Sequence, residues 1–587
     1  MHAPSPWLGR LSRAAPVAVA LLVAAVLLPR VIPLAEIAAL SPFGRDQGIF
    51  HYVGWSLLQG EVLYRDVRDV NGPLTGFVHA AFIWLGAEEE TRFRTLELAV
   101  GAICAFVLGS ALPGIASPRG SRTPRPSLGA RVAWGAAAVA VLGAQYLHYD
   151  WWHSAQRESF ADWFVMLALA AALYGLASFQ GDELGDEQKR QRLALGLAGF
   201  FAAIPIFGKP TFLVAGAVIA AAALAERPSG LGRGGRFVWL TLGLGLGGGL
   251  LLAMLASFGD LEAFLRTSAY DVPAMYRFIW PQPLAWFFGA NRRAHELWAG
   301  VGGSAVLLVL IGAKLMPGRA LAIALLPLGA IGAMIAQRKG FDYHHHTITL
   351  AVRLQLLLLA VWAVESWSQE PRRILRYAAP ALGALLALLG VAKHDLDHSP
   401  HAMHPELAEL FGAPEARQGE AYFARFPQWD FYPLDMRRAA AFLQANTPSN
   451  ARVQTYGMDP YLLHLAKRRS ATPYIYSYDL SPSAALRGGE DLQPNEAQRE
   501  VILAIRERHE DDLLARLEAA PPAAFVLIDV SPTMGSRDAR EDLETWCPRT
   551  AEWLDLRYDL GAQIGAFRIY LPNEKLAHQS KTAATPR

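Results

Sequence analysis

The chain has 587 residues, of which 53% are hydrophobic and 18% are charged, and its formal net charge is +2. This composition is too apolar for an ordinary soluble enzyme of this length and is typical of a membrane protein. Its basic residues occur in short scattered groups, so no continuous basic surface for a nucleic-acid partner is expected. Two cysteines, Cys104 and Cys547, support neither a disulfide framework nor a thiolate metal site.

The first long apolar run covers residues 15–33. A cleaved signal peptide is the alternative interpretation, but Arg30 and Pro33 fit the pattern of a cleavage site poorly. We therefore interpret 15–33 as the first membrane span. The polar and aromatic stretch at 41–73 is then the first outer loop.

A shorter apolar stretch follows at 74–87. As a helix it is about 21 Å long, against a hydrocarbon core of about 30 Å, so we interpret it as re-entrant or interfacial. Longer apolar runs then recur along the chain, and we expect about 11–13 transmembrane helices in all. These runs cover residues 95–113, 131–148, 159–179, 193–208, 210–225, 236–258, 297–313, 318–336, 346–366 and 375–392.

The loop charges predict which side of the membrane each loop faces. With the N-terminus inside, the basic loops all face inward, as the positive-inside rule requires. These inner loops are 114–131, 181–192, 226–236, 314–319 and 366–376. Counting 74–87 as a full span would put most of this basic charge outside. The outer loops carry carboxylates, histidines, tryptophans and isolated cations, which predicts an outward-facing active surface.

The composition changes after the last span. Residues 393–587 alternate short β-like runs with helical stretches, which is typical of a small soluble α/β domain. We expect strands at 453–457, 472–476, 523–529 and 566–571 and helices at 434–446 and 495–519. The predicted organisation is a transmembrane domain over 1–392 and an extracytoplasmic α/β domain over 393–587.

Two patterns look like ligand sites but have simpler interpretations. The glycine-rich run at 242–250 lies inside a span, so it favours close helix packing over phosphate binding. The segment 393–404 contains four histidines and two aspartates, but its spacing matches no zinc motif. A solvated linker is the favoured interpretation, with a metal site as the alternative.

The first outer loop carries a series of recognisable features. Asp46 opens an amphipathic segment that Gly60 ends, so a surface helix is expected there. The carboxylate of Asp46 is either the N-cap of that helix or a functional group. Asp66 precedes an Asn-Gly-Pro turn, and Pro73 suits the first position of the short helix that follows.

These features resemble the first outer loop of the polyprenyl-phosphate-sugar-dependent glycosyltransferases of the GT-C superfamily. The likeness is to the protein O-mannosyltransferase-like and lipid A aminoarabinose-transferase-like bacterial members. Their loop runs Asp-Glu-Gly, an aromatic helix, Gly, Tyr-x-Asp and Lys-Pro-Pro-Leu. This chain has Asp46-Gln47-Gly48, Gly60, Tyr64-Arg65-Asp66 and Asn71-Gly72-Pro73-Leu74. It departs from the pattern at Gln47, where the second acid is an amide, and at Asn71, where the lysine is absent.

The resemblance implies a mainly α, polytopic, GT-C-like membrane fold with a C-terminal soluble α/β domain. It implies a hexosyl- or pentosyltransferase that uses a polyprenyl-phosphate sugar donor. It also implies that the transfer inverts the configuration at the anomeric carbon. The acceptor would be a cell-envelope lipid, glycan or protein at the outer face of a bacterial inner membrane. Asp46 would be catalytic and Asp66 substrate-binding. The resemblance makes no cofactor certain; it allows a divalent metal, although Gln47 argues against a two-carboxylate site.

The missing lysine means that the donor phosphate needs other cations. Lys209 lies at a helix break beside a proline, where a lysine either contacts phosphate or snorkels to the membrane edge. Arg338 and Lys339 precede His344 and His345, and this segment resembles the late outer loop of the same family. It is either a cradle for the lipid phosphate or a polar loop that ends a span.

Glu158 begins a predicted span beside an aromatic cluster. A carboxylate there complements the helix dipole without any further function. With Trp151 and Trp152 nearby, it is alternatively a group that binds sugar hydroxyls. Interfacial tryptophans are also ordinary membrane anchors.

Two other functions compete with glycosyl transfer. A transporter or flippase usually places ionisable residues near the middle of the membrane. The charged candidates here lie mostly at the outer ends of spans, and Arg353 is the main exception. A non-catalytic partner in envelope polysaccharide assembly is the third possibility, because a degenerate relative would show the departures at Gln47 and Asn71.

Overall fold

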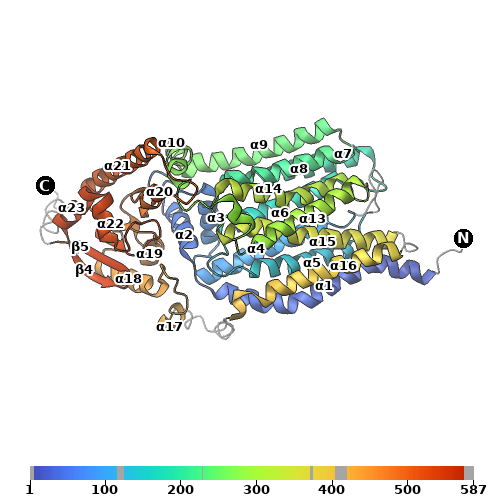
Figure 1. Ribbon diagram of the computed structural model, residues 1–587, viewed down its shortest axis with the longest axis horizontal. Helices are drawn as coiled ribbons and strands as arrows, with labels where there is room; N and C mark the ends of the chain where they lie inside the picture. The colour runs from blue at the N-terminus through green and yellow to red at the C-terminus, as the bar shows by residue number, and fades with distance from the viewer. Residues whose placement is uncertain (1–5, 116–124, 228, 370–373, 404–418, 574–587) are drawn as a thin grey trace. The chain divides into compact units, whose positions relative to one another are not determined.

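The computed structural model describes residues 6–115, 125–227, 229–369, 374–403 and 419–573 (Figure 1). Parts of two predicted inner loops, 116–124 and 370–373, lie outside the described residues. The chain forms two compact units. The helical unit comprises residues 1–41, 89–252 and 284–411, and the mixed unit comprises residues 42–88, 253–283 and 412–587.

The helical unit is a bundle of long apolar helices (Figure 1). Its main helices are α1 (Pro6–Leu40), α4 (Glu90–Ala111), α5 (Leu128–Leu147), α6 (Arg157–Leu176), α7 (Leu184–Ala203), α8 (Leu213–Ala225), α9 (Arg233–Phe258), α13 (Ala294–Gly312), α14 (Leu321–Gln337), α15 (His346–Gln369) and α16 (Ile374–Asp397). Within the described ranges, nine helices are long and apolar enough to cross a membrane. The protein is therefore a multi-pass membrane protein, which confirms the predicted fold class.

Helices α7 and α8 account for part of the difference from the expected 11–13 spans. The N-terminal half of α7 is highly charged, and α8 is short, so neither meets the length and hydropathy of a complete span. The stretch predicted as re-entrant or interfacial forms α3 (Pro73–Trp84), which is also short and apolar.

Helix α15 lies at the centre of the helical unit. It packs against α1, α5, α6, α13, α14 and α16, and 89% of its apolar window is buried. Its first turn follows the short helix η5 (Asp342–His345), which carries two of the predicted histidines. The burial of α15 thus places those histidines among neighbouring helices.

The glycine-rich run packs as the sequence predicts. A Cβ atom on Gly243 of α9 would lie 1.9 Å from the carbonyl oxygen of Gly196 of α7. A Cβ atom on Gly199 would lie 2.0 Å from the carbonyl oxygen of Leu240. The two backbones touch because neither helix carries a side chain at these points, which is the close packing that glycine permits in membranes.

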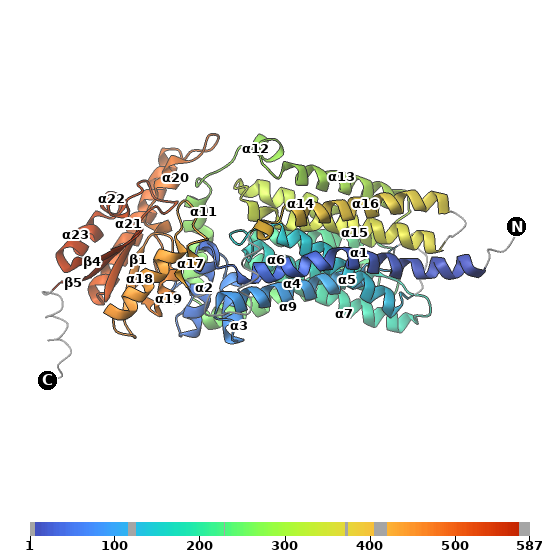
Figure 2. The same ribbon diagram turned by 90° about the horizontal axis from the view of Figure 1, so that it is seen from below.

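The mixed unit contains a five-stranded sheet in the order β2-β1-β3-β5-β4 (Figure 2). Its strands are β1 (Arg452–Tyr456), β2 (Arg469–Ser470), β3 (Ala524–Ile528), β4 (Tyr558–Ile564) and β5 (Phe567–Pro572). Strand β1 is parallel to β2 and β3, with Thr455 opposite Val526, whereas β5 is antiparallel to β3 and β4. The C-terminal α/β prediction is confirmed.

Helices of the mixed unit pack against this sheet. They are α18 (Pro433–Asn446), α19 (Tyr461–Ala466), α20 (Ser483–Arg487), α21 (Glu496–Ala519), α22 (Ala539–Trp546) and α23 (Pro548–Arg557). Phe525 and Leu527 of β3 join side chains of α21, α22 and α23 in one buried apolar cluster. Alternate residues of a strand point to one face of the sheet, which is why these two act together.

The first outer loop belongs to the mixed unit. It contains α2 (Arg45–Leu58) and, after a turn, α3. Gly60 has φ +84° just beyond α2, a conformation that glycine adopts without strain, and Pro73 occupies the first turn of α3. The predicted helix and its stop are present, but α2 is buried along most of its length inside the mixed unit, so its prediction as a surface helix is wrong. Residues 253–283 contribute α10 (Leu261–Arg266), η3 (Thr267–Asp271) and α11 (Val272–Tyr276).

Candidate functional site

Three predicted substrate-binding residues meet inside the helical unit. Glu158 lies in the first turn of α6, Lys209 precedes the short helix η2 (Pro210–Phe212), and His344 lies in η5. The Lys209 ammonium donates a hydrogen bond to Glu158 Oε1, and His344 Nε2 lies 3.6 Å from the same oxygen. We call these three residues the Lys209 cluster.

Local sequence holds Glu158 and Lys209 in place. The first turn of α6 is fixed by a capping box, in which the backbone N–H of Gln156 donates to Ser159 Oγ at 2.9 Å. Lys209 has extended backbone between η1 (Ile204–Phe207) and η2, because Pro210 begins a new helical turn. Lys209 is 9% exposed, so its ammonium does not snorkel to the membrane edge.

Burial dominates the electrostatics of the Lys209 cluster. It lowers the pKa of Lys209 to about 8; the Glu158 carboxylate opposes this shift and the Arg157 guanidinium adds to it. Glu158 Oε2 and both ring nitrogens of His344 have no hydrogen-bond partner among the described residues. Leaving such groups buried and unpaired costs about 1–3 kcal/mol each, which is the pattern of a site that a polar ligand completes.

A narrow apolar slot of about 30 Å³ adjoins the Lys209 cluster. Its apolar wall comes from α6, α8, η2 and α14, including Val165, Phe212, Val214, Leu326, Ala330 and Met334. Its polar wall consists of the Lys209 cluster with Thr211, Gln337 and Thr347. The slot is therefore lined by both charged and hydrocarbon side chains.

Sequence reasoning missed two side chains of this region. Gln337 Nε2 donates to Thr211 Oγ1 at 3.4 Å, and Gln337 Oε1 has no hydrogen-bond partner among the described residues. Arg157 influences the charge of Lys209 through space. Its position was a usable signal, because a cation in the first turn of a helix opposes the helix dipole and needs another reason to be there.

The other predicted cradle residues take separate places. Arg338 ends α14 with left-handed backbone and is partly exposed. Lys339 is buried, which lowers the pKa of its ammonium to about 7. His345 contacts Asn291 Nδ2 through its Nε2 at 3.1 Å, away from the Lys209 cluster's carboxylate. Lys339 and His345 nevertheless lie near enough to His344 to interact electrostatically with its ring.

Asp46 lies in the mixed unit, at the second residue of α2. The N-cap of α2 is Gly44, and no side chain caps it, so the interpretation of Asp46 as the N-cap is wrong. The adjacent Arg45 is buried and pairs with Asp430 at 2.9 Å and Asp459 at 2.8 Å. These ion pairs fix the first turn of α2, on which Asp46 sits.

Asp66 has local partners in the turn after α2. Its carboxylate accepts from the Val62 amide at 2.9 Å and pairs with Arg65 at 2.8 Å. These contacts fit the turn-forming interpretation. The substrate-binding role that the resemblance implies for Asp66 stays a prediction.

The histidine-rich segment after the last span is part of α16 and the turn beyond it. Asp395 forms a two-point ion pair with Arg353, and Glu296 also pairs with this arginine. His404 lies outside the described residues. Within the described ranges, no group of three or more histidine, cysteine or carboxylate side chains is arranged to hold a metal ion. The divalent metal that the resemblance allows stays a prediction.

Neither a protein-family model nor a curated protein matches the sequence. The structure is similar to the crystal structure of ArnT from Cupriavidus metallidurans bound to undecaprenyl phosphate, with a TM-score of 0.50 and 13% identity over 96% of this chain and 99% of that chain. It also matches the archaeal oligosaccharyltransferase AglB from Archaeoglobus fulgidus in complex with an inhibitory peptide and a dolichol-phosphate. That match has a TM-score of 0.46 and 12% identity over 93% of this chain and 74% of that chain.

The class of protein follows from the similarity to ArnT and from the helices. The chain is a polytopic membrane protein with a GT-C fold, as its first outer loop predicts. At 13% identity the similarity establishes the fold alone. Activity has to be argued from the residues of this chain.

Proposed function

We propose that the protein is an integral membrane glycosyltransferase. It moves a sugar from a polyprenyl-phosphate donor to a cell-envelope lipid, glycan or protein. The observation that carries this proposal is the Lys209 cluster, where a buried cation and unpaired polar atoms adjoin an apolar slot. A lipid-linked phosphate is complementary to this arrangement, because it has an anionic head and a hydrocarbon chain.

The Lys209 cluster supplies what a leaving phosphate needs. The Lys209 ammonium stabilises the negative charge that builds on the phosphate oxygen. His344, whose ring nitrogens have no hydrogen-bond partner in the described part of the chain, can donate a hydrogen bond to the same phosphate. Glu158 raises the pKa of Lys209 and so favours its charged form, while its second oxygen is left to accept from a sugar hydroxyl. The slot holds only two or three water-sized groups, so its walls must yield to admit the donor.

The proposed reaction is a single displacement at the anomeric carbon. The acceptor oxygen forms a bond to this carbon while the bond to the phosphate oxygen breaks, and polyprenyl phosphate leaves with the bonding electrons. Asp46 takes or orients the proton of the acceptor hydroxyl. Arg338, Lys339 and His345 are the further candidates for holding the donor. Displacement in one step inverts the configuration at the anomeric carbon.

The membrane orientation supports an outer-face reaction. With the N-terminus inside, the predicted inner loops are rich in arginine, and the break at Lys209 and the segment before α15 face outward. We propose that this face is the outer side of a bacterial inner membrane, and that the α/β portion is extracytoplasmic. A lipid-linked donor reaches that side, whereas a soluble nucleotide sugar of the cytoplasm does not.

The ion pairs of Arg353 weaken the case for a transporter. Arg353 was the one charged candidate that did not lie at an outer helix end. Its guanidinium pairs with Asp395 at 2.7 Å and donates to Glu296 at 2.5 Å, all three being buried. A guanidinium held by two carboxylates links α13, α15 and α16. Such a fixed group is poorly suited to pass an ion across the membrane.

The transfer assay tests this function directly. Purified protein in lipid nanodiscs is incubated with polyprenyl-phosphate sugars and a membrane extract as acceptor, and release of polyprenyl phosphate is measured. We expect Asp46→Asn to lower the rate by about 10²–10⁴-fold, the usual contribution of a general base. Asp559→Asn, an exposed aspartate of β4, is the matched control and keeps the wild-type rate.

Two results would count against the proposal. If the wild-type protein consumes no donor of a broad panel, the non-catalytic alternative takes its place. If the wild-type protein is active and Asp46→Asn is equally active, the protein is a glycosyltransferase but Asp46 is not its base.

A further inference from the structure

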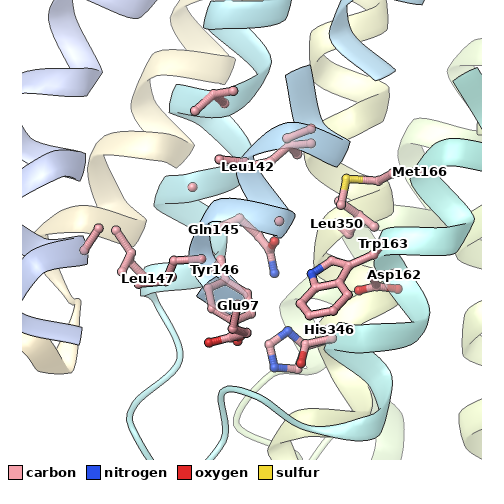
Figure 3. A pocket seen from close by; sticks show the side chains of 18 of the residues that line it. Glu97, Leu142, Gln145, Tyr146, Leu147, Asp162, Trp163, Met166, His346 and Leu350 are labelled. Carbon is pink, nitrogen blue, oxygen red and sulfur yellow. The ribbon is translucent and has the colours of Figure 1, made fainter. Parts of the chain in front are cut away.

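The helical unit contains a second amphipathic cavity that the proposed chemistry does not use. It has a volume of about 120 Å³ and lies among α1, α4, α5, α6 and α15 (Figure 3). Its α6 residues Ser159, Asp162, Trp163 and Met166 lie on a different face of that helix from Glu158 and Val165, which border the Lys209 slot. We call it the α4–α6 cavity.

One end of the α4–α6 cavity is apolar and the other is polar. Figure 3 shows Leu142, Leu350 and Met166 at one end, and Glu97 and His346 at the other. Further apolar lining comes from α1 and α4, through residues Val31, Ala35, Leu98, Gly101, Ala102 and Ala105. This division suits an amphiphile with a hydrocarbon body and a polar head.

The polar end presents mainly hydrogen-bond acceptors. The carboxylate of Glu97 accepts from the Tyr146 hydroxyl, and Asp162 Oδ1 accepts from Thr347 Oγ1 at 2.6 Å. The two carboxylates are 2% and 6% exposed, respectively, as whole residues. The side-chain nitrogen of Gln145, another residue of the lining, donates to Thr349 Oγ1 at 2.7 Å, and the amide oxygen can only accept hydrogen bonds.

The histidine of the cavity completes this set of acceptors. His346 Nε2 lies 2.9 Å from the carbonyl oxygen of His153, so in the neutral ring Nε2 carries the proton and Nδ1 is an acceptor. The described residues that line the cavity include no lysine or arginine. A head that donates hydrogen bonds is complementary to this end, and an anionic head would meet no cation among these described residues.

The two pockets therefore favour ligand head groups of different chemistry, although they share a wall. Thr347 lines the Lys209 slot and donates to Asp162, which lines the α4–α6 cavity. The slot offers a cation to a ligand, whereas the cavity offers carboxylates. Water alone explains the cavity poorly, because one water needs about 10–15 Å³ and hydrogen-bond partners, and most of this lining is hydrocarbon.

We propose that the α4–α6 cavity binds an amphiphile whose head carries hydroxyl or amine donors and no negative charge. The hydrocarbon body lies against α1 and α4, and the head donates to Glu97 and Asp162. An alcohol and an ammonium share this chemistry. The binding proposed for this cavity follows from the residues that line it and does not depend on glycosyl transfer.

Photo-crosslinking tests this site without any activity assay. The full chain in phosphatidylcholine nanodiscs is exposed to four sixteen-carbon probes that each carry a mid-chain diazirine and differ only in the head: alcohol, amine, phosphate or carboxylate. Labelled peptides are identified by mass spectrometry. We expect saturable labelling of α4 and α6 by the alcohol and the amine, and labelling at least tenfold weaker by the two anionic probes.

A cavity-filling variant and its control locate the site. A Cβ atom on Gly101 would lie 3.4 Å from Trp163 Nε1, so Gly101→Leu projects its side chain into the cavity and removes the labelling. Gly332→Leu on α14 is the matched control, because a Cβ atom there meets nothing within 4 Å, and it labels as the wild type does. Ala102→Leu repeats the test if Gly101→Leu does not fold.

The head-group preference has its own variants. The double variant Glu97→Gln with Asp162→Asn lowers amine labelling at least tenfold and alcohol labelling less than threefold, because the amides still accept hydrogen bonds but carry no charge. Lys209→Met leaves both unchanged.

Labelling that does not saturate, that survives Gly101→Leu and Ala102→Leu, or that is as strong with the phosphate probe would overturn the proposal. A failed transfer assay would leave it standing.

Discussion

Lys209 shows how tertiary surroundings set the charge of a single residue. From sequence it is a lysine at a helix break, with snorkelling and phosphate contact as equal alternatives. In the structure its ammonium is buried beside Glu158, and burial lowers its pKa to about 8. Its charge is thus at the edge of the physiological range, where a bound phosphate would favour protonation.

We expect binding of a polyprenyl phosphate to weaken as the pH rises from 7 to 9. The folded pKa of Lys209 is lowered to about 8, so its charge is present below that pH and is lost above it. The second ionisation of a phosphate monoester, near pH 6, is already complete in this range. The measurement is a Kd series by microscale thermophoresis in nanodiscs.

Three variants isolate Lys209 in that series. Lys209→Arg stays charged throughout, so its Kd changes little with pH. Lys209→Met binds about 10–100-fold more weakly at pH 7, the loss of about 1.5–3 kcal/mol for a hydrogen bond to a charged group. Lys339→Met keeps the wild-type pH profile. If the pH dependence of the Kd were lost in Lys339→Met and kept in Lys209→Arg, Lys209 would not be the group that binds the phosphate.

At the scale of elements, most segments with a clear apolar pattern were predictable, and two short segments were not. The helices expected at 434–446 and 495–519 are α18 and α21, and the strands expected at 453–457, 523–529 and 566–571 are β1, β3 and β5. The strand expected at 472–476 is wrong. Its backbone groups bond to neighbouring loops and side chains instead of a ladder, as with Gln454 Nε2 donating to the Tyr474 carbonyl.

Strand β4 was missed for a related reason. Its sequence, YDLGAQI, is mostly exposed and lacks a continuous apolar alternation. It becomes a strand because β5 lies antiparallel beside it, with Leu560 opposite Tyr570. An edge strand of this kind is specified by its partner more than by its own pattern.

The contact between α2 and α3 carries a pH-sensitive pair. His51 Nδ1 lies 3.3 Å from His79 Nδ1, both rings are buried, and His51 Nε2 contacts the Glu88 carbonyl at 3.0 Å. Burial lowers the pKa of His51 well below 6.5, and the nearby His464, His79 and Lys467 lower it further. The folded state therefore holds His51 neutral.

We expect the α2–α3 contact to loosen as the pH falls below about 6.5. The unfolded segment binds a proton near its ordinary pKa while the folded one does not, so the contribution to stability is complete above that pH and declines below it. Hydrogen exchange of α2 and α3 peptides at pH 7.5 and 5.0, corrected for intrinsic rates, measures this. Protection should drop at pH 5.0.

The variant His51→Gln serves as the control for this prediction. Its amide can still donate to the Glu88 carbonyl but does not titrate. Protection in His51→Gln should depend much less on pH than in the wild type. Equal pH dependence in both proteins would show that another group is responsible.

At the scale of the whole molecule, the mixed unit is assembled from three separated stretches of chain. Arg68 joins all three. Its guanidinium forms a two-point pair with Asp479 at 2.8 and 2.9 Å, contacts Asp271 at 3.2 Å and donates to Thr267. This is why the compact units do not follow the single boundary at 392/393 that composition suggests.

We expect Arg68→Met to destabilise the mixed unit by about 3–5 kcal/mol, because the buried Asp479 loses its two-point cation and Asp271 keeps only one arginine pair, with Arg508. The apparent Tm in detergent should fall by several degrees. Arg65→Met is the matched control, three residues away, since Arg65 pairs with Asp66 at the surface and is 55% exposed at its side chain. Equal Tm losses in the two variants would contradict the role assigned to Arg68.

The sequence by itself determined the membrane class, most of the spans, the outer-loop pattern and the α/β character of the C-terminal part. These features depend on hydropathy and periodicity, which are local properties of the chain. Only the tertiary structure decided that Glu158, Lys209 and His344 form one cluster, that Arg68 joins distant stretches, and that Glu97 and Asp162 share a cavity. Such contacts join residues up to 411 positions apart, and packing chooses among the many partners that residue type alone allows.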